Sequence, residues 1–166
     1  MNYKEIRLQI KSGDLLSFNH GSWNTISGIK TEIVHMATRS TYSHVGIAWV
    51  IANRVFVLEA VEPCLRIFPL SLEGDFYWTP LNASWHPETE EYALSKLGIN
   101  YSEIQAMQAF YEELPPDSVQ QCAAYAREIL LKDGINLGSR STPDAVVLAA
   151  QTLGNPTYYI QNERNI

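Results

Sequence analysis

The sequence has few cysteines, few positive charges and no long apolar run. Its 166 residues include two cysteines, and 12 Lys and Arg stand against 18 Asp and Glu, for a formal net charge of -6. The basic residues form no run, which argues against a nucleic-acid partner. No stretch of 18 apolar residues occurs, so the sequence predicts no transmembrane segment.

Motifs for metal binding and for export are also missing. No C-x-x-C or H-E-x-x-H pattern is present, so we predict neither a metal ion nor another cofactor. Residues 1–7 are charged and lack an apolar core, which predicts no signal peptide and a cytoplasmic location. A phage-borne protein that leaves the cell by lysis or in a virion would look the same. In a reducing compartment Cys64 and Cys122 are expected to stay unpaired.

The chain length and the 46% hydrophobic residues predict one domain over residues 1–154, with a polar, loosely held tail at 155–166. Short β-branched and aromatic runs predict strands at 14–18, 43–50, 54–60, 64–69 and 75–81. Helical spacing predicts helices at 23–36, 87–97, 102–113, 118–132 and 143–153. The last four strands are expected to form an antiparallel meander. The predicted fold class is α+β, a small antiparallel sheet packed against helices on one face.

Cys122 lies where a helix is expected to begin. Ser118 and Gln121 have the S-x-x-Q spacing of a capping box. Free backbone N–H groups at a helix start favour a thiolate and can hold an oxyanion. The same helix also has an apolar stripe that contains Cys122 along with Val119, Ala126 and Ile129. A buried core cysteine is therefore an alternative interpretation.

His44 lies in the apolar run Ser43-His44-Val45-Gly46-Ile47. Strand alternation places His44 on one face with Gly46 and Ala48, whose small size leaves room for a helix end or a substrate. The other face carries the residues expected to meet the core, which are Val45, Ile47 and Trp49. The alternative interpretation is a histidine with a purely structural role.

Glu59 ends the next predicted strand and is the only acid in its apolar run. If the two strands form a hairpin about Ala52-Asn53, Glu59 lies near His44. A carboxylate there could fix the imidazole tautomer and stabilise the imidazolium. The alternative is a solvated carboxylate at the end of a strand.

Five segments together resemble the permuted branch of the NlpC-type papain-like cysteine peptidases. This branch comprises the YiiX-like and YebB-like proteins, with the lecithin:retinol acyltransferase group as relatives. The segments are 13–18, 42–47, 58–60, 98–101 and 121–122. In that branch an S-H-V-G-I strand and a strand ending in Glu precede a helix that opens with Cys. The resemblance covers roughly residues 12–150 and implies a circularly permuted papain-like fold.

The resemblance implies Cys122 as the nucleophile, His44 as general base and then acid, and Glu59 as the residue that orients His44. It implies that Tyr101 and Ser43 line the substrate pocket. Asp14 is expected to order the loop near His44. One departure is Cys122-Ala123-Ala124, where the family often has Cys-Ser-Glu, and this puts the substrate contacts in doubt.

The function implied is a cysteine-dependent hydrolase or acyltransferase that forms an acyl-enzyme on Cys122. The expected substrate is a small peptide or acyl compound with an amide or ester bond, of the cell-wall peptide or acyl-lipid type. The alternative is a catalytically silent papain-like module that binds a peptide or an acyl chain. The oligomeric state is left open.

Overall fold

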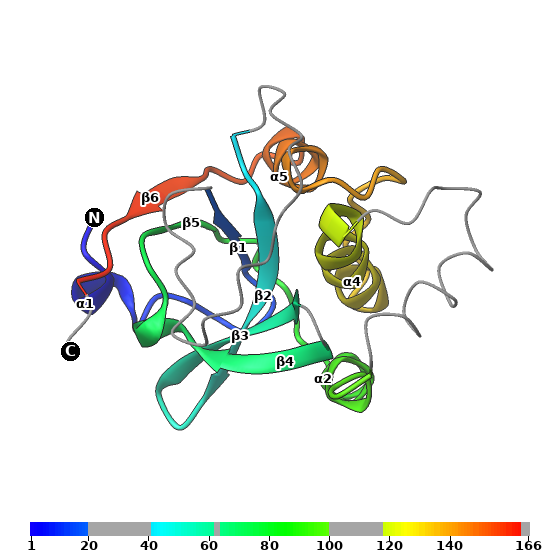
Figure 1. Ribbon diagram of the computed structural model, residues 1–166, viewed down its shortest axis with the longest axis horizontal. Helices are drawn as coiled ribbons and strands as arrows, with labels where there is room; N and C mark the ends of the chain where they lie inside the picture. The colour runs from blue at the N-terminus through cyan, green and yellow to red at the C-terminus, as the bar shows by residue number, and fades with distance from the viewer. Residues whose placement is uncertain (20–40, 62–63, 100–117, 164–166) are drawn as a thin grey trace.

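A computed structural model describes residues 1–19, 41–61, 64–99 and 118–163, with only the backbone of 118–121 (Figure 1). The strands are β1 (Leu15–Phe18), β2 (His44–Ile51), β3 (Arg54–Val61), β4 (Cys64–Pro69), β5 (Phe76–Thr79) and β6 (Tyr158–Ile160). The helices are α1 (Tyr3–Ile6), α2 (Pro87–Ser95), α4 (Ser118–Lys132) and α5 (Pro143–Thr152), with a 3₁₀ turn η1 (Leu70–Leu72). The helices predicted at 23–36 and 102–113 lie outside the described residues. The described fold is α+β, as predicted.

The sheet has six antiparallel strands in the order β4-β3-β2-β1-β5-β6. The meander predicted for β2, β3 and β4 is confirmed. Its extension to β5 is wrong, because β5 pairs with β1, with Leu15 opposite Thr79. The first strand lies between β2 and β5, and a local reading of the 43–81 segment could not detect this long-range pairing.

Asp14 ties β5 to the start of β1. One carboxylate oxygen accepts hydrogen bonds from the Trp78 indole N–H at 2.8 Å and the Lys11 backbone N–H at 2.9 Å, and the other accepts from the Leu81 N–H at 3.1 Å. His44 pairs with Phe18 at the opposite end of β1. The expected ordering of the loop near His44 by Asp14 is therefore wrong, because this side chain acts at the far end of the strand.

The C-terminal segment is part of the sheet and is not the loosely held tail that we predicted. Residues 158–160 form β6 along β5, with Tyr159 opposite Tyr77, and Ile160 is fully buried. The backbone of Gln161 bonds to Met1 and Tyr3, so the two ends of the described chain lie side by side (Figure 1). The prediction was wrong because, without residues 158–160, one edge of β5 would be unpaired. An aromatic and apolar segment is well suited to pair with such an edge as a strand.

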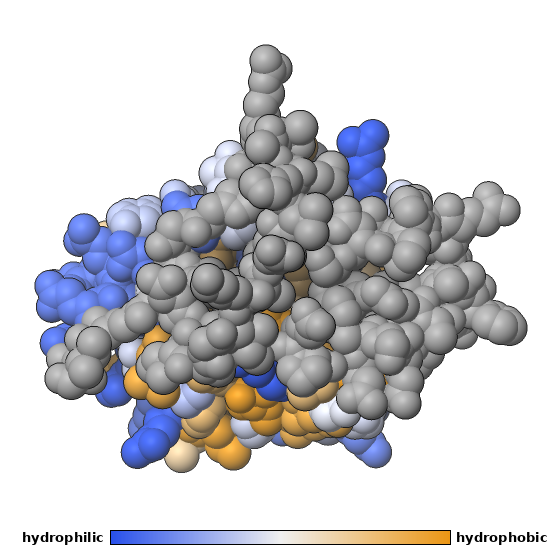
Figure 2. Space-filling model, viewed as in Figure 1, coloured by the Kyte–Doolittle hydropathy of each residue, from blue (hydrophilic) through white to orange (hydrophobic). Residues whose placement is uncertain are grey.

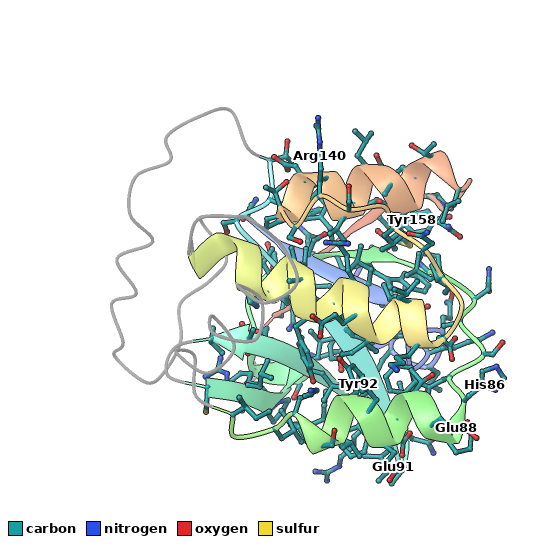
Figure 3. The ribbon with its side chains drawn as sticks, turned by 90° about the vertical axis from the view of Figure 1, so that its right-hand side faces the viewer. His86, Glu88, Glu91, Tyr92, Arg140 and Tyr158 are labelled. Carbon is teal, nitrogen blue, oxygen red and sulfur yellow. The ribbon has the colours of Figure 1, made fainter. Side chains whose placement is uncertain are left out.

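A hydrophobic core lies on each face of the sheet, and the three longer described helices lie together on one side, as predicted. On one side α4, flanked by α2 and α5, covers β2 and β3 (Figures 1 and 3). The other side has its own core, in which residues of β1, β2, β3, β5 and β6 pack with the N-terminal segment. Its members include Tyr3, Ile6, Ile10, Leu16, Phe18, Ala48, Val57, Phe76 and Ile160.

α4 is locked to its neighbours by polar contacts at several points along its length. The Tyr125 hydroxyl donates to the Ala93 carbonyl at 2.9 Å, and Tyr92 reaches from α2 towards α4, where its hydroxyl donates to Glu128 at 2.8 Å (Figure 3). Asp133, just after α4, accepts hydrogen bonds from the Trp85 and His86 N–H groups at the start of α2. These contacts fix the helix that carries Cys122. None of the described helices is long and apolar enough to cross a membrane.

Candidate functional site

The β2–β3 hairpin brings Glu59 to the first residue of β2. Ala52 and Asn53 form its turn, and both have positive φ angles, 49° and 60°. Two such residues make the turn whose twist matches a hairpin. The pairing runs from Ile51 opposite Arg54 to Ile47 opposite Leu58, so the following residue, Glu59, lies beside the start of β2.

His44 and Glu59 form a buried hydrogen-bonded ion pair. The His44 Nε2 atom lies 2.8 Å from Glu59 Oε2. His44 is 3% exposed and Glu59 is fully buried. Since a carboxylate only accepts hydrogen bonds, Nε2–H donates, and the ring has its Nδ1 atom for another partner. The predicted contact is thus present.

Gly46 allows β2 to lie close to β3. A Cβ atom at position 46 would lie 3.4 Å from the Glu59 Cβ, 2.4 Å from a Val57 methyl carbon and 2.9 Å from the Leu58 carbonyl oxygen. The last two distances are too short for a side chain. The glycine is therefore needed for the close approach of β2 and β3, which places the carboxylate against His44.

We expect Gly46→Ala to lower the free energy of unfolding by about 1–3 kcal/mol, because the added methyl group must push β3 away from β2. Urea unfolding at neutral pH measures this change. Ile51→Ala, at the exposed end of the same strand, is the matched control and should change stability by about 0.5 kcal/mol or less. An unfolding midpoint for Gly46→Ala equal to that of the wild type would contradict the close approach of the two strands.

Cys122 is the fifth residue of α4 and is 2% exposed. Its thiol hydrogen-bonds with the His44 ring. Because Glu59 occupies Nε2, Nδ1 is the ring nitrogen that faces the sulfur. The backbone N–H groups of 118–121, immediately before Cys122, form the first turn of the helix and lack acceptors within it. The predicted capping side chains of Ser118 and Gln121 lie outside the described side chains.

Electrostatics favour a charged His44. Burial by itself would lower the pKa of His44, but the charge and hydrogen bond of Cys122, followed by those of Glu59, outweigh it and raise this pKa to about 10. Burial also opposes ionisation of Glu59, yet the hydrogen bonds and charges of His44 and Arg66 hold its pKa below the usual value. The site therefore suits an imidazolium beside the Glu59 carboxylate.

Arg66 completes the site, and our sequence analysis missed it. Its Nε and Nη2 atoms lie 2.8 and 2.7 Å from Glu59 Oε1, the oxygen that His44 does not use. Arg66 is directly opposite Glu59 in the β3–β4 pairing. The sequence did contain a signal for this contact. If residues 62–63 link the two strands, residue 61 lies opposite 64 and residue 59 lies opposite 66. Glu59 and Arg66 then form a cross-strand pair of opposite charge.

The surroundings of His44 differ from the open face that we predicted. Its ring lies 5.7 Å from the Phe18 ring, and Ala48 on the same face belongs to the second core. Ser43 is buried, and its hydroxyl donates to the Phe18 carbonyl at 3.3 Å. A role for Ser43 in substrate binding stays a prediction. Tyr101, the other predicted pocket residue, lies outside the described residues.

The segment before β2 is fixed by α5. The Asp144 carboxylate, in the first turn of that helix, accepts hydrogen bonds from the Thr41 and Tyr42 backbone N–H groups at 3.1 and 3.0 Å. This anchor sets where the chain enters β2, two residues before His44.

The view in Figure 2 shows apolar surface gathered towards its lower part, where β3 and β4 lie in Figure 1.

Comparisons with known proteins show the fold alone. No protein-family model matches the sequence, and no curated protein matches it significantly. The structure is similar to the crystal structure of the metalloprotein YiiX from Escherichia coli O157:H7, DUF1105, with a TM-score of 0.53 and 20% sequence identity. The match covers 79% of this chain and 71% of the other.

Proposed function

We propose that this protein is a cysteine-dependent hydrolase or acyltransferase with a circularly permuted papain-like fold. The observation that carries the proposal is the buried chain of contacts from Cys122 to His44 to Glu59. A thiol, an imidazole and a group that orients the imidazole make up the nucleophilic machinery of papain-like enzymes. The likeness to the YiiX structure and the order His44, Glu59, Cys122 along the chain support the permuted assignment.

The proposed reaction begins with proton transfer from Cys122 to Nδ1 of His44. The thiolate attacks the carbonyl carbon of an amide or ester, and backbone N–H groups at the start of α4 stabilise the oxyanion. The His44 imidazolium then protonates the leaving amine or alcohol as the carbon–heteroatom bond breaks, which leaves a thioester on Cys122. Water or an acceptor alcohol or amine, deprotonated by His44, attacks the thioester and regenerates the thiol.

YiiX is described as a metalloprotein. We therefore asked whether the described residues of this chain could hold a metal ion. Among the described residues, no group of three or more His, Cys, Asp or Glu side chains is arranged to hold a metal ion. His44 and Glu59 use their facing atoms for each other and for Arg66. These residues do not fit a metal centre, and the proposed reaction involves none.

The burial of Cys122 favours a second candidate function. A thiol that is 2% exposed and packed in the core beneath α4 also suits a module that binds a peptide or an acyl chain without turnover. The two candidates differ in whether a covalent acyl group ever forms on the sulfur.

Trapping of the acyl-enzyme tests the proposed function. The folded protein with Cys64→Ser is incubated with activated acyl esters and peptide amides, and its intact mass is measured after an acid quench. We expect a mass increase equal to one acyl group, located on Cys122 by peptide mapping and absent in Cys122→Ser. A thiol that stays unmodified by every substrate, and reacts with alkylating reagents only after denaturation, would reject the enzyme and favour the binding module.

A further inference from the structure

Arg66 holds the side of Glu59 that faces away from His44. Both guanidinium contacts go to Oε1, while His44 takes Oε2. The carboxylate is fully buried, whereas the Arg66 side chain is 24% exposed and lies over the Phe68 ring, 4.6 Å from its centre. The Arg66 side chain therefore reaches from a partly exposed position to a buried anion.

Arg66 adds a positive charge beside the buried Glu59 carboxylate, in addition to that of His44. With Cys122 as thiolate and Glu59 as carboxylate, the site holds two negative charges, and the His44 imidazolium supplies a single positive one. Arg66 supplies the second. Glu73, whose Oε1 atom is 4.0 Å from Arg66 Nη2, is a further buried carboxylate beside the guanidinium, at a longer distance than Glu59. The Phe18 ring beside His44 and the Phe68 ring beside Arg66 carry no charge.

Without Arg66, the buried Glu59 would keep His44 as its one partner of opposite charge among the residues that the structure describes. In one case the imidazolium would interact mainly with Glu59 and would stabilise the thiolate less. In the other case Glu59 would take up a proton and would no longer stabilise the imidazolium. Either change removes the conditions under which Cys122 is ionised. A guanidinium suits this task because it stays charged at any working pH and holds a carboxylate in a fixed orientation.

We propose that Arg66 is a positioning residue that neutralises and orients Glu59, so that Glu59 and Cys122 are ionised at the same time with His44 between them. The inference rests on the proposed function and extends its three side chains to four. Arg66 acts through Glu59 and does not touch the reacting atoms.

Thiolate formation in Arg66 variants tests this inference. The ultraviolet absorbance of the thiolate is followed against pH, with the Cys64→Ser background and with Cys122→Ser subtracted. We expect Arg66→Gln, which can keep a hydrogen bond but loses the charge, to raise the midpoint by about one pH unit. Arg66→Lys, which keeps the charge, should remain close to the wild-type midpoint. Arg66→Met, which can still pack on Phe68, replaces the glutamine variant if that variant does not fold.

Arg54→Met is the matched control, because Arg54 is an exposed arginine in the same sheet, at the turn end of β3. It should leave the thiolate midpoint unchanged. In acyl transfer, Arg66→Gln should lower kcat about 10-fold and leave KM unchanged, as expected for a residue that does not contact substrate. A midpoint for Arg66→Gln that moves no further than that of Arg54→Met overturns the inference and makes Arg66 a strand-pairing residue.

The two proposals fail in different ways. A low thiolate midpoint that depends on Arg66, without any acyl-enzyme, rejects the proposed function and supports the role of Arg66. An acyl-enzyme that forms equally well in Arg66→Gln, with an unchanged midpoint, rejects the role of Arg66 alone. A wild-type thiol that ionises only near the ordinary pKa of about 8.5 rejects both.

Discussion

Alanine in place of His44 is expected to slow the alkylation of Cys122 by iodoacetamide about 30-fold at pH 7. The reason is that a thiol with no base to take its proton is only a few per cent ionised at that pH. In the proposed mechanism, His44 takes the proton of the thiol and leaves a thiolate that can be alkylated. The turnover of an acyl substrate should fall further, by about 100-fold or more, because the general acid and base are lost together.

The measurement is the rate of alkylation from acid to alkaline pH in folded protein that carries Cys64→Ser. We expect the wild-type rate to reach half its plateau well below the ordinary thiol pKa, and the His44→Ala rate to follow that of a free thiol. His86→Ala is the control, since His86 is exposed and lies before α2. Equal pH profiles for the wild type and His44→Ala would show that the imidazole does not activate the thiol.

The second large effect is on stability, where Glu59→Ala should lower the free energy of unfolding by about 3 kcal/mol or more. Removal of the carboxylate leaves the buried His44 and the partly buried Arg66 without the anion that both contact. Urea unfolding at pH 7 gives the difference. Glu88→Ala, on the surface of α2, removes the same charge and should cost about 0.5 kcal/mol or less. Similar losses for the two variants would mean that the buried ion pairs contribute little.

The pH dependence of stability follows from the same pair and has a definite sign. The pKa of Glu59 is lower in the folded state than its ordinary value of 4.5, so its contribution is complete above about that pH and is lost as the pH falls through the folded pKa. The pKa of His44 is raised from 6.5 to about 10, so its contribution is complete below about 6.5 and is lost as the pH rises towards 10.

Unfolding measured at a series of pH values should therefore show the largest difference between wild type and Glu59→Ala from about pH 4.5 to 6.5, with a smaller difference on each side. A difference that stays constant from acid to alkaline pH would show that Glu59 acts through packing rather than through its charge.

Local patterns in the sequence predicted the elements that carry the site. The two-residue period of a strand and the link at Ala52-Asn53 were enough to place Glu59 near His44, and the contact is 2.8 Å long. The start of the Cys122 helix was likewise predicted by its apolar stripe and its boundary signals. These signals work because hairpins and helix termini are determined by residues close together in the chain.

The position of Arg66 could have been predicted from local sequence, but its importance could not. Its place beside Glu59 depends only on a short hairpin and could have been predicted from the two-residue link at 62–63. The importance of the contact could not, because it comes from the complete burial of Glu59 between β2 and β4. The burial of a carboxylate turns an ordinary cross-strand pair into a constraint on the charge of the site.

By itself, the sequence determined the α+β class, the hairpin that joins His44 to Glu59 and the helix that presents Cys122. Only the tertiary structure decided that β1 enters between β2 and β5, that 158–160 complete the sheet and that a second core covers the face on which His44 lies. The physical reason is sequence distance. Pairings such as Leu15 with Thr79, and contacts such as Cys122 with His44, depend on how all the apolar faces are buried together, and no local period specifies that arrangement.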